Sequence, residues 1–303
     1  MLMKKIGIIG VGHVGSTTAY TLIQQQVADE IILYDKNEGL VEAEVNDLLQ
    51  GQIGQASTVG IKGNQLAELG HCDLLIFSAG NIQLLQGDTD RFEELDFTKK
   101  VVEEWAPKIK ESGFNGILLS ITNPCDVIVR YLQELTGLPK NQVFGTGTAL
   151  DTVRMQQAIG TALKVHPNSV NGYVLGEHGE TQFIAWSTIR IANQDLSTKL
   201  TATEQLALEE EARAAGWRIF MGKVYTCYGI ANQATKIAKA ILTNAQLILP
   251  VSSYSETEKI YIGQPSLIGN SGIIKAYNLT LSVAEKIKWD LSVQRIKEMY
   301  EAI

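Results

Sequence analysis

Residues 4–15, KKIGIIGVGHVG, join a short apolar run to the pattern Gly-x-Gly-x-x-Gly. The run Lys4–Gly10 is nearly continuous in isoleucine and predicts a strand that is buried on both faces. The glycine pattern alone is a weak signal, but here it follows a predicted strand and opens a predicted helix, Val14–Gln26. This stretch therefore predicts the first strand–turn–helix unit of a nucleotide-binding fold.

Each residue of the pattern has a physical role in that context. Gly10 permits the tight turn, Gly12 lets backbone amides approach a pyrophosphate, and Gly15 lets helix and strand pack closely. The helix that opens at Val14 would turn its unpaired N–H groups toward the phosphates. Asp35 ends the second predicted strand, 20 residues after Gly15, where a carboxylate would accept from both ribose hydroxyls and repel a 2′-phosphate. The cofactor is therefore predicted to be NAD rather than NADP.

The alternation of strand and helix continues through the first half of the chain. Such repetition predicts the α/β class, as a Rossmann-type doubly wound parallel sheet with right-handed crossovers. We assign residues 1–145 to this NAD-binding domain and expect Pro107 to kink or divide its third helix. Strands are expected at Lys4–Gly10, Glu30–Asp35, Leu74–Ala79 and Gly116–Thr122, and helices at Val14–Gln26, Glu38–Leu49, Phe92–Ser112 and Asp126–Gly137.

The rhythm changes after about Gly145, and residues 146–303 are predicted to form a mixed α+β substrate domain. A long helical region, Thr203–Leu242, is expected to break near Gly216 and Gly222. The terminal helix opens with Ser282 and Glu285 in capping-box spacing. A further helix is expected at Thr148–Leu163, and strands at Val170–Leu175, Phe183–Ile191, Leu247–Tyr254 and Gly272–Tyr277.

The bulk composition restricts the partners of the protein. Its 303 residues carry a net charge of −7, so nucleic acid and anionic membranes would be repelled at long range. No apolar stretch approaches the ~20 residues that span a bilayer. The cysteines, Cys72, Cys125 and Cys227, lack CxxC spacing and are expected to be buried reduced thiols. We expect a cytoplasmic protein that acts on small molecules, without nucleic-acid or membrane partners.

His178 stands out among the four histidines because it lies in the segment LGEHGETQ, between two glycines and two glutamates. A metal ligand is poorly supported, since HExxH is absent and no second histidine is near in sequence, and no metal is predicted. A packed core ring would not need glycine on both sides. An imidazole exchanges protons near neutral pH, so a proton carrier is the favoured interpretation.

Asp151 and Arg154 lie three residues apart in a predicted helix and share one face of it. A surface ion pair is the usual interpretation of an isolated pair with this spacing. The alternative is that Arg154 binds a substrate carboxylate through two parallel hydrogen bonds. Asp151 would then hold one nitrogen of the His178 ring and favour the protonated ring.

A polar segment at residues 82–94 connects the third predicted strand to the next helix. Loops at the carboxyl ends of parallel strands are where such sheets bind ligands, so this segment is a candidate lid. Its closure would deliver Arg91 to a carbonyl oxygen, although Arg91 among acids could also be merely solvated. Asn123 follows the fourth strand and is either a turn residue or a hydrogen-bond donor to a ligand.

Taken together, GVGHVG, YDKN, SITNPCDV, GTGTALDTVRMQ, LGEHGETQF and YTCYGIA resemble the L-lactate and L-malate dehydrogenase family over nearly the whole chain. The lid and the run GYVLGEHGETQFIAWST are most similar to its L-2-hydroxyisocaproate dehydrogenase branch. The resemblance implies a homotetramer in which His178 is the proton donor and acceptor. It implies that Asp151 orients His178, that Arg154 binds the substrate carboxylate, that Arg91 polarises the carbonyl, that Asn123, Gln83 and Thr226 line the substrate site, and that Ala79, Gly80, Asn123 and Ile230 lie beside the cofactor.

Departures from the family pattern narrow the range of expected substrates and regulators. Malate enzymes carry arginine where this chain has Gln83, so oxaloacetate would lack a second cationic clamp. Leu84 and Leu85 follow in a lid two residues longer than in typical lactate enzymes, which suggests a roomier apolar pocket. Gln156 and Asn171 replace the arginine and histidine of enzymes regulated by fructose 1,6-bisphosphate, so activation by that compound is not expected.

The sequence thus predicts an NAD-dependent L-2-hydroxyacid dehydrogenase. It would transfer hydride reversibly between NADH and C2 of a small aliphatic 2-oxo acid such as 2-oxoisocaproate, and also pyruvate. The alternative is an L-lactate dehydrogenase proper; a malate dehydrogenase or a non-catalytic NAD-binding sensor is less favoured. A short-chain reductase would require Tyr-x-x-x-Lys, which this chain lacks.

Overall fold

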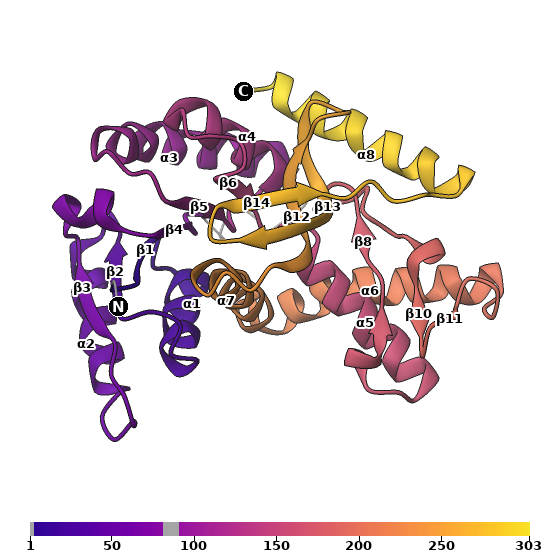
Figure 1. The fold of residues 1–303 in the computed structure, drawn as a ribbon, viewed down its shortest axis with the longest axis horizontal. Helices are drawn as coiled ribbons and strands as arrows, with labels where there is room; N and C mark the ends of the chain where they lie inside the picture. Colours follow the sequence, from indigo (N-terminus) through magenta and orange to yellow (C-terminus); the bar gives the residue numbers. More distant parts are fainter. Residues whose placement is uncertain (1–2, 81–90) are drawn as a thin grey trace.

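A nine-stranded sheet organises the computed structural model, which describes residues 3–80 and 91–303. The strand order is β14-β13-β12-β6-β5-β4-β1-β2-β3. Strands β6 to β3 in this order are parallel, and β12, β13 and β14 add to their edge in antiparallel pairing (Figure 1). The strands of this sheet are β1 (Lys5–Ile9), β2 (Glu30–Tyr34), β3 (Gly60–Gly63), β4 (Leu74–Phe77), β5 (Ile117–Ser120), β6 (Val143–Gly145), β12 (Leu247–Ser255), β13 (Ile260–Gly269) and β14 (Gly272–Ala276).

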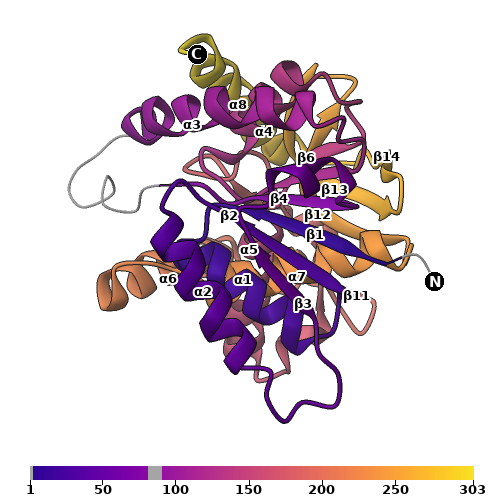
Figure 2. The same ribbon diagram turned by 90° about the vertical axis from the view of Figure 1, so that its left-hand side faces the viewer.

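Helices cover both faces of the sheet, which confirms the predicted α/β doubly wound class (Figure 2). Successive strand residues therefore enter opposite apolar clusters: Ile8 packs with α1, α2 and α7, and Ile9 with α3, α4 and α8. The helices are α1 (His13–Gln24), α2 (Glu38–Gln50), α3 (Arg91–Glu111), α4 (Cys125–Thr136), α5 (Ala149–Leu163), α6 (Ala202–Lys223), α7 (Tyr228–Leu242) and α8 (Val283–Glu301), with short 3₁₀ turns at Leu66–His71, Pro167–Ser169 and Trp186–Thr188.

Two small antiparallel sheets lie beside α5 and α6 in the second half of the chain. The two segments expected there as continuous strands are instead divided by turns. One sheet joins β7 (Val170–Asn171), β10 (Arg190–Ile191) and β11 (Gln194–Asp195), and the other joins β8 (Val174–Leu175) and β9 (Phe183–Ile184).

Several sequence expectations fail where glycine or proline is tolerated. Of the two outcomes expected at Pro107, division of the helix does not occur, because α3 continues through this residue. Gly216 lies inside α6, which continues to Lys223. The predicted break near Gly222 is close to the observed one. The strands β3, β6 and β13 were not expected: β3 and β6 are short and carry glycine, and β13 includes Pro265 among its ten residues. Pairing with buried neighbours outweighs the local propensity of such residues.

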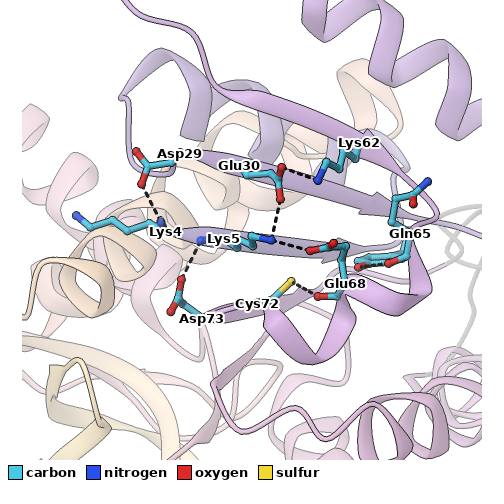
Figure 3. A network of polar contacts seen from close by, with 10 residues as sticks. Lys4, Lys5, Asp29, Glu30, Lys62, Gln65, Glu68, Cys72 and Asp73 are labelled. Atoms are coloured by element: carbon cyan, nitrogen blue, oxygen red, sulfur yellow. Dashed lines mark hydrogen bonds and ion pairs between the residues drawn. The ribbon is translucent and has the colours of Figure 1, made fainter. Parts of the chain in front are cut away.

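Ion pairs close the amino ends of the parallel strands (Figure 3). Lys5, the first residue of β1, contacts Glu30 at 3.3 Å and Glu68 at 2.6 Å, and Lys62 contacts Glu30 at 2.8 Å. The hydrogen bond to Glu68 raises the pKa of Lys5, against the lowering effect of burial. Asp73 accepts from the backbone amide of Lys5 at 2.8 Å. Charge is thus paired at this end, and the glycine turn lies at the opposite end of β1.

The described cysteines are free and buried, as the sequence predicted. Burial raises the pKa of Cys72 to about 12 and that of Cys125 well above its ordinary value. In the described part of the chain, no helix is both long and apolar enough to cross a bilayer.

Candidate functional site

A cavity of about 860 Å³ lies at the carboxyl ends of the parallel strands. This volume is typical of small-molecule and cofactor sites. Its wall is built from the glycine turn after β1, the segments after β4 and β5, α5, the loop after β8, α6 and the start of α7. The predicted site residues that line it are Gly12, Val14, Ala79, Gly80, Asn123, Asp151, Arg154, His178, Thr226 and Ile230.

The three glycines of the turn have different steric surroundings. Gly10 has a φ of +89°, and a Cβ there would lie 2.7 Å from the backbone of Ala79. A Cβ on Gly15 would lie 1.9 Å from the carbonyl oxygen of Gly10. A Cβ on Gly12, by contrast, would meet no heavy atom within 4 Å, although Gly12 lines the cavity. Gly10 and Gly15 therefore allow the close turn, and Gly12 leaves open space where a cofactor phosphate would fit.

Asp35 lies just after β2 and supports this turn. Its carboxylate accepts from the backbone amides of Val11 and Asn37, each at 3.0 Å. Gly10, Gly15 and Asp35 do not line the cavity themselves. The structure therefore gives Asp35 a role that spacing alone did not indicate, because its carboxylate ties the glycine turn to the neighbouring strand.

Asp151 joins the two other predicted groups on the cavity wall. One of its oxygens lies 2.6 Å from Nδ1 of His178, and the other accepts from Nη1 of Arg154 at 2.9 Å. The aspartate side chain is 3 % exposed, whereas those of Arg154 and His178 are 17 % and 18 % exposed. A buried carboxylate thus holds a guanidinium and an imidazole, both partly exposed, at the cavity surface.

The charge of Asp151 is stabilised despite its burial. Burial alone raises the pKa of Asp151, but the neighbouring His178 and Arg154 outweigh it and hold that pKa below its ordinary value. Gln182, which the sequence did not single out, adds to this effect. When the Gln182 amide is oriented with its NH2 group toward Asp151, it donates to the two carboxylate oxygens at 3.1 and 2.8 Å.

The loop that carries His178 is held on several sides. Gly176 has a φ of +95° and pairs with Gly263 of β13 in a two-way backbone bridge of 3.0 Å bonds. The Glu177 carboxylate accepts from the backbone amide of Thr181 at 3.0 Å. The backbone amide of His178 donates to Asp126 of α4 at 2.9 Å. Gly176 therefore serves close backbone packing as well as the placement of the ring.

The guanidinium of Arg154 lies against a glycine of α6. A Cβ on Gly216 would lie 2.9 Å from Cζ of Arg154, and Gly216 also lines the cavity. The Arg154 Nε atom is buried without a hydrogen-bond partner among the described residues. The glycine thus gives the guanidinium room, and part of its donor capacity remains for a ligand.

Two rings that the sequence did not indicate stack on each other at the cavity wall. His13, in the glycine turn, stacks on Tyr225, with ring centroids 3.8 Å apart and an interplanar angle of 7°. Tyr225 precedes the predicted site residue Thr226. No pattern in the sequence pairs residues so far apart in the chain.

Two predicted site residues cannot be placed relative to the cavity. Gln83, with Leu84 and Leu85 of the predicted lid, lies outside the described residues, and so does the side chain of Arg91, the first residue of α3. Among the described side chains, no group of three or more histidine, cysteine, aspartate or glutamate residues is arranged to hold a metal ion.

Comparison with known proteins matches nearly the whole chain to one family. Residues 4–145 match the lactate/malate dehydrogenase NAD binding domain, and residues 148–303 match the lactate/malate dehydrogenase alpha/beta C-terminal domain. The chain is 36 % identical over 307 residues to L-lactate dehydrogenase of Halalkalibacterium halodurans, covering 99 % of this chain and 97 % of that protein. It is 35 % identical over 312 residues to L-lactate dehydrogenase 2 of Staphylococcus aureus, with the same coverage.

Solved structures agree over the same span. The minor L-lactate dehydrogenase of Enterococcus mundtii, in its ligands-bound form, superposes with a TM-score of 0.95 at 32 % identity, covering 99 % of this chain and 98 % of that one. The lactate dehydrogenase of Cryptosporidium parvum, complexed with lactic acid and nicotinamide adenine dinucleotide, superposes with a TM-score of 0.94 at 26 % identity and the same coverage. This chain therefore belongs to the lactate/malate dehydrogenase family and carries that family's NAD-binding fold.

Proposed function

We propose that this protein is an NAD-dependent L-2-hydroxyacid dehydrogenase whose main reaction is the interconversion of pyruvate and L-lactate. One observation carries the proposal: Asp151 bonds both His178 and Arg154 on the wall of the cavity into which the glycine turn opens. The relatives named above are L-lactate dehydrogenases, so they favour the alternative prediction over the 2-hydroxyisocaproate branch.

The proton is moved by His178. Because Nδ1 of the ring is held by Asp151, Nε2 is the nitrogen that gives a proton to the substrate oxygen during reduction and takes it back during oxidation. The anionic Asp151 stabilises the imidazolium that this step requires. NADH, when bound, supplies the hydride that reaches C2. The transfer balances, because one hydride and one proton convert the keto group to the alcohol.

Arg154 fixes the substrate by its carboxylate. Nη1 is engaged by Asp151, and Nε has no hydrogen-bond partner among the described residues, so the guanidinium keeps donor capacity for an anion in the cavity. Arg91 is proposed to stabilise the charge that develops on the substrate oxygen. Asn123 and Thr226 complete the polar wall of the substrate site. Gln83 is uncharged and therefore favours a 2-oxo acid with a neutral side chain over oxaloacetate.

The cofactor would lie along the first half of the cavity wall. Gly12 and Val14 would receive the pyrophosphate at the amino end of α1, and Ala79, Gly80 and Ile230 would border the remainder of the dinucleotide. Asp35 keeps lone pairs for the ribose hydroxyls in addition to the two amides that it accepts. Residues 1–145 are proposed as the NAD-binding domain and residues 146–303 as the substrate domain, in a homotetramer.

A substrate panel tests the proposal. The purified protein is mixed with NADH and pyruvate, 2-oxoisocaproate or oxaloacetate, and the loss of NADH absorbance is followed. We expect the highest kcat/KM with pyruvate, slower turnover of 2-oxoisocaproate, and no response to fructose 1,6-bisphosphate. One methylene changes discrimination in an apolar pocket by only about 1–3 kcal/mol, so the preference between the first two is expected to be graded.

Each other result has a defined meaning. A preference for oxaloacetate would contradict the role given to Gln83. A preference for 2-oxoisocaproate would restore the 2-hydroxyisocaproate prediction. Absence of turnover with all three acids, in a protein that still binds NADH, would favour a sensor and overturn the proposal.

A further inference from the structure

Asp126 is a buried charged residue that the mechanism above does not use. It is the second residue of α4, in the motif SITNPCD that also carries Asn123, and it is 2 % exposed. It does not line the cavity, so it does not touch the substrate or the cofactor. Burying a carboxylate is costly unless strong hydrogen bonds compensate, and its partners therefore indicate its function.

Those partners lead directly to the reacting histidine. One oxygen of Asp126 accepts from the backbone amide of His178 at 2.9 Å, and the other accepts from the hydroxyl of Ser252 at 2.5 Å. Ser252 is fully buried in β12, opposite Gly263 of β13, and Gly263 is bridged to Gly176 at the start of the histidine loop. Asp126 thus links α4, the central sheet and the loop.

We propose that Asp126, held by Ser252, is a positioning residue for the reaction, which fixes the backbone of His178 so that its ring meets Asp151 at the cavity. The inference rests on the proposed function, because it assigns His178 the proton transfer. Asp151 holds the ring and Asp126 holds the main chain of the same residue. Two buried carboxylates thus constrain His178, one at its ring and the other at its backbone amide.

Protonation of Asp126 would weaken this anchor, because both of its oxygens serve as acceptors. Burial raises the pKa of Asp126 to about 6, even though the hydrogen bonds from Ser252 and His178 and the charge of His178 lower it. The other titratable groups that face it are Glu177, whose charge raises that pKa, and the thiol of Cys125 beside it. As pH falls through this value, the carboxyl group gains a proton and loses acceptor capacity.

Reduction of a 2-oxo acid requires a protonated His178, which produces only an alkaline limb in the pH profile of kcat. An acid limb near the pKa of Asp126 is therefore expected in the wild-type protein. Asp126→Asn is expected to remove this limb. Its amide oxygen can still accept from the His178 amide, and its NH2 group can donate to the Ser252 hydroxyl. We expect kcat at neutral pH to fall about tenfold or less in Asp126→Asn and about 100-fold in Asp126→Ala, since small misplacements of a reacting group have effects of that order.

Ser252 provides a milder variant and a matched control. Ser252→Ala removes the hydrogen bond that lowers the pKa of Asp126, so the acid limb should move to higher pH. Ser253 is equally buried in the same strand, but its hydroxyl lies 2.8 Å from that of Ser266. Ser253→Ala should leave the limb where it is. An unchanged acid limb in Asp126→Asn, or the same profile in Ser252→Ala and Ser253→Ala, would overturn the proposal.

A measurement without turnover separates this inference from the proposed function. Histidine labelled with ¹³C gives four ring signals, and His178→Asn assigns one of them. Because the charges of Asp126 and His178 interact, loss of the Asp126 charge in Asp126→Asn should lower the titration midpoint of the His178 ring. If the wild-type protein reduces no 2-oxo acid but the midpoint moves, only the proposed function fails. An unmoved midpoint in both Asp126→Asn and Asp126→Ala, of which only the second removes the acceptor for the His178 amide, would overturn the positioning role even in an active enzyme.

Discussion

The nucleotide end and the reacting end of the cavity are built in opposite ways. The nucleotide end is one turn, Gly10–Gly15, braced by Asp35 at the end of the adjacent strand. The reacting end brings Asp126 from α4, Asp151 from α5 and His178 from the loop after β8 into contact. The first is local in sequence, and the second joins segments that only the folded chain brings together.

The difference shows what each end depends on. At the nucleotide end, glycines leave out side chains, so the backbone can turn and a ligand can approach. At the reacting end, buried carboxylates hold cationic or donor groups in place. Damage at the first end should therefore act through steric clashes and cofactor affinity. Damage at the second should act through chemistry, with the fold and the cofactor affinity largely kept.

The largest expected effect tests the reacting end. His178→Asn removes the proton donor, and general acid–base groups contribute about 10²–10⁴-fold, so kcat for pyruvate should fall by that factor. The affinity for NADH, measured by fluorescence titration, should change little, because the side chain at position 178 does not contribute to the glycine turn. Turnover close to that of the wild type would show that His178 is not the proton donor. A parallel loss of NADH affinity would contradict the separation of cofactor binding from chemistry at the two ends of the cavity.

The same contrast explains which features were predictable from the sequence. Strands β1, β2, β4 and β5 are continuous apolar runs, and the glycine spacing carries its own geometry, so the doubly wound fold followed from local rules. His178, Asp151 and Arg154 were expected together, and the structure brings them together. The resemblance to a known family located Thr226 and Ile230, which composition and periodicity did not indicate.

Long-range partners were the features that the sequence could not provide. The bond from His178 to Asp126 spans 52 positions and that from Ser252 to Asp126 spans 126. In sequence Asp126 is simply an acid at the start of a helix, a common position for one. Spacing put Asp35 at the end of the second strand, yet its bond to the Val11 amide depends on the pairing of β1 with β2. Each of these hydrogen bonds depends on segments that only the folded chain brings together.

A pair of alanine substitutions sharpens the steric side of the comparison. Gly15→Ala places a Cβ 1.9 Å from the carbonyl oxygen of Gly10, so the backbone must shift. Overpacking of this kind costs about 1–3 kcal/mol, and the free energy of unfolding in urea should fall by that amount. Gly12→Ala meets no neighbour and should keep its stability, but lose NADH affinity by several-fold because it occupies ligand space. Equal stability of the two variants would contradict the distinction.

The smallest expected effect concerns Gly216, a glycine at the reacting end, where buried carboxylates otherwise do the positioning. Gly216→Ala in α6 would place a Cβ 2.9 Å from Cζ of Arg154, and the guanidinium is the far end of a flexible side chain, so it can move. The KM for pyruvate should rise a few-fold while NADH affinity stays constant. Gly222→Ala on the same helix meets nothing within 4 Å and is the matched control. Both substitutions replace a helical glycine and should gain up to about 1 kcal/mol in helix propensity, so stability alone cannot separate them. A KM that rises equally in both variants would show that α6 as a whole, rather than the space beside Arg154, governs substrate binding.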